Sequence, residues 1–506
     1  MGCRGSDIDE GALQVGAGTQ KLNSRLRIRR LVGWAGAGTP LLASLLACQQ
    51  ALAADDRMLL LDHDGLTIRM HLQAGLNVVA EHNVFWNYAD TFAPSAGFDS
   101  NKTWLEGYIL PGLSFTRELG GVVAYGKVSA VASGTLGIDA YATGNTGRVT
   151  LEEGYLGLRS DENSDPSFDV SVGPREFKAG TGMLLANGGS SGFDRGALKL
   201  GPRKAWEMAS IGRFGFDNFT GTAFYLDANE QNESDSHTRI VGGDFRYDGE
   251  ANTFAGMTFG HVLKSDSPYP KAAPGGIGVP TLVANGRDGL NFVNVYGRAI
   301  PFGDSFENLF VAGDFAYQWN EDVDMRAWGG RVQVGYTFAE YSWAPTIVYS
   351  YQTFSGDDPS TSRLERFDPL YYEGSPSSWS TGSKSSMVFI NSNVNAHQLS
   401  LRVTPTERDT LTLRYAYISA NELRSPIQFG QGTHLEIING VPNPVAGVSA
   451  KHLSDDIFLE YNRVLNPNTY LTAGFSVSFP GPGSDSVVSS NAPVWTGGFV
   501  NVVVNF

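Results

Sequence analysis

The chain has 506 residues, a formal net charge of −15 and two cysteines. Charged residues make up 18% of it, aromatic residues 11%, and glycine is abundant with 61 copies. Beyond the first 53 residues no apolar stretch approaches the roughly 18 residues that a membrane-spanning helix requires. These totals exclude a helical membrane protein, and the acidic balance makes nucleic acid an improbable partner.

Residues 1–53 have the layout of a secretory signal peptide. A basic segment, Lys21–Arg30, precedes an apolar run, Leu31–Cys48, and Ala51–Ala53 supplies an A-x-A cleavage site. Cleavage there removes both cysteines, so we expect no disulfide framework or thiol site in the mature chain. A lipoprotein-like box at Leu45–Cys48 is the competing interpretation. Residues 54–65 are expected to be a short periplasmic segment, and residues 66–506 a single domain.

That domain is predicted to consist of long strands. From Leu66 to Val78 apolar and polar residues alternate without error, which a helix would not produce. The stretch is also longer than a usual soluble strand and matches the 9–11 residues of a tilted membrane strand. The predicted strands are Leu66–Val78, Thr103–Thr116, Val122–Leu136, Thr150–Arg159, Ser167–Phe177, Arg195–Ile211, Phe219–Ala228, Arg239–Tyr247, Asn252–Leu263, Leu290–Ile300, Leu309–Trp319, Ala327–Phe338, Pro345–Phe354, His397–Val403, Thr410–Ala420, Asp456–Val464, Thr469–Phe479 and Thr496–Phe506.

Connections between these strands alternate between short and long, which is typical of outer-membrane barrels with short periplasmic turns and long extracellular loops. The alternation holds if Arg195–Ile211 is one strand bent at Gly201-Pro202. The predicted fold is therefore all-β: one antiparallel transmembrane β-barrel of about 18 strands, in the outer membrane of a Gram-negative bacterium.

The last stretch, Thr496–Phe506, is predicted to pair with Leu66–Val78 and close the barrel. Its alternation places Asn501 and Asn505 toward the lumen. The terminal Phe506 is expected at the inner membrane rim, as the C-terminal signal for the barrel-assembly machinery.

With the apolar face of each strand assigned to lipid, the opposite face lines the channel. Its predicted basic residues are Arg69, Lys127, Arg175, Arg195, Lys199, Arg298, Arg331, Arg402 and Arg414. Its predicted acidic residues are Glu106, Glu153, Asp169, Asp244 and Asp314. Because the basic residues of this lining outnumber the acidic ones, it is expected to attract anions. Each arginine alone is more often a residue that fills the barrel interior.

The sequence carries few signs of a catalytic or metal-binding site. The sequence has no H-E-x-x-H zinc motif, its eight histidines are scattered, and the acidic loop Ser355–Asp358 lacks the spacing of an EF-hand. We therefore expect no enzyme, no metal and no cofactor. The expected partners are outer-membrane lipid and lipopolysaccharide, the assembly machinery, and an anionic saccharide or organic acid.

Several short motifs resemble the alginate-export family of outer-membrane porins. Tyr349–Pro359 (YSYQTFSGDDP) and Glu365–Tyr372 (ERFDPLYY) are followed by Asn391–Asn393, a T-P-T turn at 404–406 and the strand Thr410–Ala420. Val172–Gly182 (VGPREFKAGTG), with Phe193-Asp194, resembles the family's G-R-Q-x-x-x-x-G strand and its F-D segment, with Pro174 before Arg175 and Glu176 at the glutamine position.

This resemblance implies a monomeric 18-stranded barrel whose arginine-rich constriction passes an anionic polysaccharide outward, with Arg175 as the matching constriction residue. The leading interpretation is thus a passive channel for anionic solutes, with export of an exopolysaccharide such as alginate as a candidate role. The alternatives are a general or selective uptake porin for sugars or small organic acids, an outer-membrane lipase or deacylase, and a surface adhesion protein.

Overall fold

The computed structural model describes residues 58–92, 97–141, 144–161, 164–374, 384–427, 435–438, 441–444, 447–488 and 491–506. The predicted signal peptide and its cleavage site lie outside the described residues. Within them, no helix combines the length and the apolar character needed to cross a membrane.

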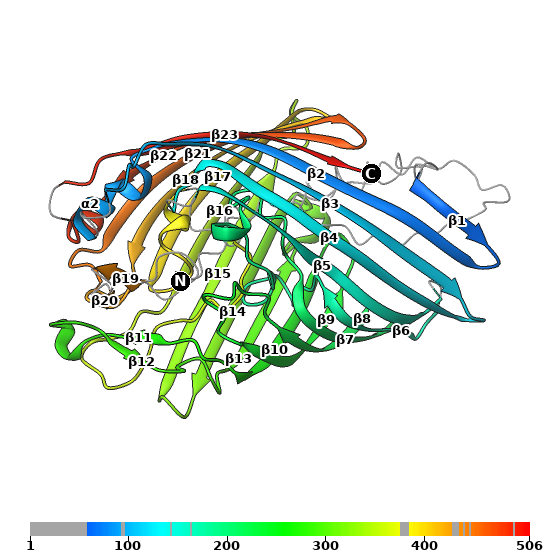
Figure 1. Cartoon of the computed structure of the whole chain (residues 1–506), viewed down its shortest axis with the longest axis horizontal. Coiled ribbons are helices and arrows are strands. Elements are labelled where there is room, and N and C mark those ends of the chain that lie inside the picture. The colour runs from blue at the N-terminus through cyan, green and yellow to red at the C-terminus, as the bar shows by residue number, and fades with distance from the viewer. Residues whose placement is uncertain are drawn as a thin grey trace.

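One sheet dominates the structure, and eighteen of its strands pair in chain order and close into an antiparallel barrel (Figure 1). β2 pairs with β3 on one side and with the last strand, β23, on the other. The barrel strands are β2 (Leu66–His82), β3 (Lys102–Glu118), β4 (Val122–Ile138), β5 (Gly144–Ser160), β6 (Ser167–Arg175), β7 (Trp206–Phe216), β8 (Phe219–Asp227), β9 (Arg239–Asp248), β10 (Phe254–Lys264), β13 (Asn291–Ala299), β14 (Leu309–Asn320), β15 (Met325–Thr337), β16 (Thr346–Phe354), β17 (Val394–Thr406), β18 (Asp409–Ala420), β21 (His452–Asn466), β22 (Thr469–Pro480) and β23 (Trp495–Asn505). The predicted fold class and strand number are confirmed.

The remaining elements are short. β1 (Leu59–His63) folds back on β2 through a turn in which Asp64 and Gly65 both have positive φ. The other elements are the hairpins β11 (Tyr269–Lys271) with β12 (Thr281–Val283) and β19 (Leu435–Ile438) with β20 (Val441–Pro444), the helices α2 (Ala89–Phe92) and α3 (Pro482–Asp485), and the 3-10 turns η2 (Val84–Asn87), η4 (Phe193–Arg195), η5 (Pro274–Gly276), η6 (Gly303–Phe306) and η7 (Ser385–Met387). In Figure 1 the C-terminus and β1 lie at the end with short turns, and both hairpins lie at the end with long loops.

The two faces of the wall differ as the alternation predicts. On β2, Leu76 and Val78 are 54% and 49% exposed, whereas Asn77 and Val79 at the alternate positions are completely buried. Across the barrel the exposed positions carry mostly Leu, Val, Ile and Phe, and the alternate positions carry the polar side chains. An apolar band outside and polar groups inside is the arrangement that a lipid-embedded barrel requires.

Aromatic rings packed flat on neighbouring strands account for part of the high glycine content. A Cβ on Gly75 would lie 2.3 Å from Tyr108 Cε1, and one on Gly474 would lie 2.4 Å from Phe499 Cε1. Both rings occupy the space that a side chain on the opposing strand would fill. Glycine at these positions is therefore required by close approach rather than by backbone conformation.

One predicted strand is wrong in its first half. Arg195–Ile211 is not a single bent strand, because β7 begins only at Trp206 and residues 195–205 belong to a loop. Gly192, Gly196 and Gly201 all have positive φ, which takes the backbone out of the extended conformation. The strand number is unaffected, since β7 supplies the wall that the bent strand was expected to supply.

The predicted pairing of the last strand with the first barrel strand is confirmed, although it involves the second half of β2, Gln73–His82. β23 pairs with β2 from Asn505 opposite Gln73 to Thr496 opposite His82. Beyond the last strand residue, Phe506 N donates to Leu72 O at 2.8 Å, and Phe506 O accepts from Leu72 N at 2.9 Å. The Phe506 side chain is 46% exposed, and its role in barrel assembly stays a prediction.

Because β23 is hydrogen-bonded on both sides, a proline within it should prevent closure. Val502 pairs with Leu76 of β2 and Leu471 of β22. We expect Val502→Pro to cost at least about 3 kcal/mol and to reduce the yield of folded barrel. The measurement is the folded fraction after refolding into detergent, followed by the heat-dependent mobility shift in gel electrophoresis. Val502→Ile is the control, and equal folded yields for the two variants would contradict the assigned pairing.

Candidate functional site: the barrel lumen

A loop between β6 and β7, residues 176–205, crosses the lumen and is called here the first inward loop. Thr181 Oγ1 donates to Asp314 Oδ1 of β14 at 2.5 Å, and Lys199 N donates to Glu106 of β3 at 2.9 Å. These two strands lie nine steps apart in an eighteen-stranded barrel, so they are opposite walls. The loop therefore spans the full width of the channel.

The connection between β16 and β17 also folds inward, and its described parts, 355–374 and 384–393, are called the second inward loop. It joins the first through backbone hydrogen bonds: Tyr371 N donates to Leu184 O, and Ala186 N donates to Tyr371 O, both at 2.8 Å. Apolar side chains of both loops share one buried cluster with the barrel wall. The two loops form one packed body within the lumen.

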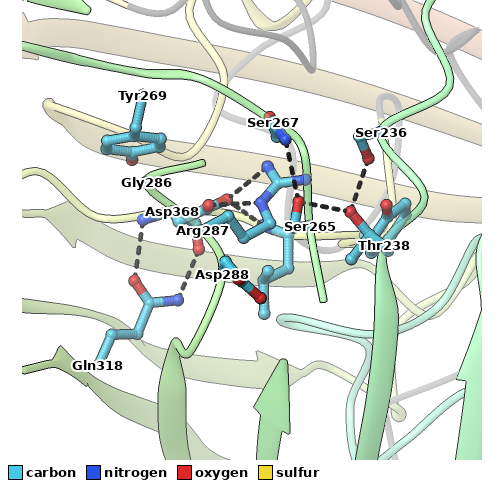
Figure 2. A network of polar contacts seen from close by, with 12 residues as sticks. Ser236, Thr238, Ser265, Ser267, Tyr269, Gly286, Arg287, Asp288, Gln318 and Asp368 are labelled. Atoms are coloured by element: carbon cyan, nitrogen blue, oxygen red, sulfur yellow. Dashed lines mark hydrogen bonds and ion pairs between the residues drawn. The ribbon is translucent and has the colours of Figure 1, made fainter. Parts of the chain in front are cut away.

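The second inward loop is clamped at Asp368, as Figure 2 shows. Arg287, from the loop after β12, donates to both carboxylate oxygens of Asp368 at 2.7 and 3.0 Å. The Gln318 side chain of β14 donates to the backbone carbonyl of Asp368 at 2.6 Å and accepts from its backbone N–H at 2.8 Å. Burial acts to lower the pKa of Arg287, but Asp368 outweighs it and the pKa rises above its usual value.

A second clamp lies at the seam between β2 and β23. The buried Glu81 carboxylate pairs with Lys384 of the second loop, with Lys199 of the first at 3.5 Å, and with Trp495 Nε1 at 2.8 Å. Ser385 N and Oγ donate to Asp456 of β21 at 2.9 and 2.6 Å. Burial lowers the pKa of Lys384 to about 8, although Glu81 opposes this shift. Both loops are thus tied to the strands that close the barrel.

The nine basic residues predicted to line the channel have three different surroundings. Lys127 pairs with Glu153, Lys199 with Glu81, and Arg331 with Asp314. Arg195, in the first inward loop rather than on a strand, and Arg298 donate to backbone carbonyls. The other four form no ion pair with any described residue: Arg69, Arg175, Arg402 and Arg414.

The five predicted acidic residues all have partners. Glu106 accepts the backbone N–H groups of Lys199 and Leu200, so it holds the first inward loop. Asp244 accepts from Thr258 Oγ1 at 2.5 Å and from Tyr296 O–H at 2.9 Å. The partners of the others are Lys127 for Glu153, Tyr125 for Asp169, and Thr181 with Arg331 for Asp314.

Arg175 belongs to a group of three arginines on β5–β7, which we call the first arginine group. Asp169 of β6 stands directly opposite Arg159 of β5 and Arg213 of β7. Arg175 stacks on Tyr155, with its guanidinium carbon 4.3 Å from the ring centre, and donates to Ser171. Arg175 also donates to the Tyr125 hydroxyl at 3.4 Å, which in turn donates to Asp169. The group therefore holds three guanidinium groups and one carboxylate on three adjacent strands.

Sequence reasoning did not single out Arg159 and Arg213. The signal was present, because Leu158 and Phe214 beside them are exposed apolar residues and the alternation then turns both arginines inward. Their common neighbour Asp169 follows from the pairing of β5, β6 and β7, which no single strand reveals.

The second arginine group is Arg402 of β17 and Arg414 of β18. Leu401 and Leu413 beside them are exposed to the outside, so both arginines face inward. Arg402 pairs with Thr412, and Arg414 with Ser400, so the two lie on neighbouring strands two residues apart. β17 is nine strands from β6. The two arginine groups therefore stand on opposite walls of the lumen.

Two arrangements of the kind found in hydrolases occur inside the barrel. His71 Nε2 lies 2.6 Å from Ser114 Oγ, but no described carboxylate bonds to its other ring nitrogen. Gly188–Gly192 has the G-x-S-x-G spacing, yet it lies in the first inward loop, and Ser190 Oγ accepts from Arg195 at 3.1 Å. Neither forms a nucleophile, base and orienting acid together.

In the acidic loop Ser355–Asp358, the Asp357 carboxylate accepts hydrogen bonds from backbone groups. Asp357 accepts backbone N–H groups from Ala272 at 2.5 Å and Glu365 at 2.7 Å, and burial raises the pKa of this carboxyl. Among the described residues no group of three histidine, cysteine or acidic side chains is arranged to hold a metal ion.

Comparisons with known proteins found one family model and several similar solved structures. The family model described as alginate export matches residues 305–491. Similar solved structures include a BenF-like porin from Pseudomonas fluorescens Pf-5 (11% identity, TM-score 0.49, 87% of this chain and 98% of that one) and the outer membrane protein opdK from Pseudomonas aeruginosa (11%, 0.49, 86% and 98%). Another is OprB from Pseudomonas putida (9%, 0.44, 87% and 94%). No curated protein matches the sequence.

The clamp at Asp368 predicts an asymmetric response to mutation. Arg287→Met leaves a buried carboxylate without its charged partner, and we expect a loss of roughly 3–5 kcal/mol in the stability of this loop packing. The double variant Arg287→Met/Asp368→Leu removes both charges and should recover most of that loss. Protease cleavage within 355–374, measured on the refolded barrel, reports the packing. A double variant as labile as the single one would contradict this account.

Proposed function

We propose that this outer-membrane channel, whose residues 305–491 match the alginate export family, conducts anionic solutes between its two arginine groups. The protein resides in the outer membrane of a Gram-negative bacterium, in keeping with the family match and with a closed barrel that is apolar outside. The family match makes an anionic exopolysaccharide such as alginate the first candidate cargo.

The observation that carries the proposal is the pair of arginine groups on opposite walls. Arg175, Arg402 and Arg414 have no ion-pair partner among the described residues, so no paired carboxylate neutralises their charge. Low-dielectric walls focus such charge and raise the local concentration of anions. Transport then needs no chemistry, only several weak and exchangeable sites for carboxylates.

The overall acidity of the chain does not oppose this lining. Several carboxylates outside the strands are paired with nearby cations, as in Asp324 with Arg363 of the second inward loop and Asp266 with Lys264 at the end of β10. The departure from the family motif at Glu176 adds a carboxyl beside Arg175. Burial raises the pKa of Glu176, which lowers the fraction of it that is ionised.

A second candidate cargo is a small organic acid or sugar acid. It is favoured by the two inward loops, which are joined to each other and anchored to opposite walls. A lumen crossed in this way admits a small anion more readily than a polymer. The charge argument is the same for both cargoes, and only size separates them.

Charge reversal in the arginine groups tests the proposal. In planar bilayers the wild-type channel is expected to select chloride over potassium. Arg175→Glu and Arg402→Glu should each weaken this selectivity, and together they should reduce the permeability ratio by roughly tenfold. The reversal potential in a salt gradient is the measurement.

Two control variants accompany this test. Arg175→Lys keeps the charge and should keep the selectivity, and Arg363→Glu reverses an exposed loop charge away from both groups. Cation selectivity in the wild type would refute the proposal. Ester hydrolysis without any conductance would instead favour the hydrolase alternative.

Voltage-dependent residence times separate the two cargoes. A hexa-uronate that passes through the channel should leave faster as the driving voltage increases, whereas one that only blocks should stay longer. We expect faster escape if the polysaccharide is the cargo. Longer residence of the hexamer, together with free permeation of a single uronic acid, would assign the channel to small acids.

A further inference from the structure

The inner face of the closing seam carries four amide side chains, which we call the seam amides. Asn77 of β2 stands directly opposite Asn501 of β23, and Gln73 stands opposite Asn505. Exposed Leu76, Val78 and Val500 lie between them on the lipid side, so all four amides face inward. The seam also lies between the two arginine groups around the barrel, four strands from β18 and three from β5.

Three of the seam amides are left with unused hydrogen-bonding groups. Asn77 is completely buried, and neither its Nδ2 nor its Oδ1 has a hydrogen-bond partner among the described residues. Within the same part of the chain, Asn501, 1% exposed, lacks a partner for Nδ2, and Asn505 lacks one for Oδ1. Buried amides are nearly always hydrogen-bonded, because leaving them unpaired costs free energy. Two adjacent buried amides facing one lumen with vacant donors and acceptors indicate a site for a polar ligand.

The seam amides lie in a row of polar side chains with aromatic rings on both sides. Thr472 of β22 stands opposite Asn501, and Asn462 of β21 stands opposite Thr472. On the other side, Glu106 of β3 stands opposite Asn77, and its carboxylate accepts backbone N–H groups of the first inward loop. On one side of this row lies the ring of Tyr108, and on the other the ring of Phe499, each over a glycine. Hydroxyl groups match amides, since both donate and accept, and ring faces suit the C–H face of a sugar.

One aliphatic side chain packs beside the seam amides. Leu200 of the first inward loop packs with Tyr108 and Val503, which lie two positions from Glu106 and Asn501 on the same inner face. Its backbone N–H is held by Glu106 at 2.9 Å. The backbone of Leu200 is therefore fixed by the wall, and its side chain packs beside the row of amides.

We propose that the seam amides bind the hydroxyl groups of a saccharide, which takes the place of the Leu200 side chain against Tyr108. This inference rests on the proposed function for the passage of solutes, and it adds a subsite that recognises hydroxyl groups rather than charge. The arginine groups would hold carboxylates, and the seam amides would distinguish a sugar acid from an unhydroxylated acid of equal charge.

The test uses a neutral probe, so that it does not depend on anion selectivity. A glucose hexasaccharide is added to the full-length channel in planar bilayers, and the residence time of each current block is measured. We expect block of the wild type, at least fivefold shorter residence in Asn77→Leu/Asn501→Leu, and longer residence in Leu200→Ala. The amide variant should fold at least as well as the wild type, since leucine matches asparagine in shape and leaves no unpaired group.

Gln333→Leu is the matched control, because Gln333 is an inward amide on β15, away from the seam. It should leave the residence time unchanged. Equal block in the wild type and the amide variant would overturn the inference, as would absence of block in both the wild type and Leu200→Ala, which would indicate a site for water only. Reversal potentials from the same channels report on the arginine groups separately. Preserved anion selectivity without sugar block removes this inference alone, and sugar block without anion selectivity removes the proposed function alone.

Discussion

The hydrogen bonds between β2 and β23 are the constraint on which the rest of the structure depends. In lipid an unpaired strand edge leaves backbone groups with no partner, so the sheet has to close. Closure joins the first and last barrel strands of a chain of 506 residues. It also determines register: a shift by one residue would place Asn77 and Asn501 in lipid and apolar residues in the lumen. The orientation of every inward side chain follows from this pairing.

The lumen of the closed barrel is filled by the two inward loops. Both inward loops are anchored by polar groups of the wall, notably Glu81, Glu106 and Gln318, and they share an apolar core with it. Buried carboxylates and amides cannot face lipid, and a wide empty lumen would leave them in water. Packing loops against them converts these groups into anchors. The seam clamp joins closure and filling, because Glu81 of β2 binds a lysine from each loop.

The location of the charged groups matters more in this protein than its net charge. The chain is acidic overall, but carboxylates inside the barrel are occupied by lysine, hydroxyl or backbone donors, while several arginines have no ion-pair partner among the described residues. The field that a solute meets is set by the groups left unpaired on the inner wall. Net charge is therefore a poor guide to what such a channel attracts.

Sequence alone determined the wall. Period-two alternation is a local property of the backbone, so the eighteen strands, the inward orientation of Arg175 and Asn501, and the closing role of Thr496–Phe506 could all be predicted from it. Tertiary structure decided what fills the lumen inside the wall. The alternation of Arg195, Ala197 and Lys199 looked like a strand, but these residues are held in a loop by Ser190, Thr135 and Glu106. Which lysine meets which carboxylate, and which arginines face one another across the lumen, depends on contacts between residues far apart in the chain. No local pattern records such contacts, because they exist only once the barrel has closed.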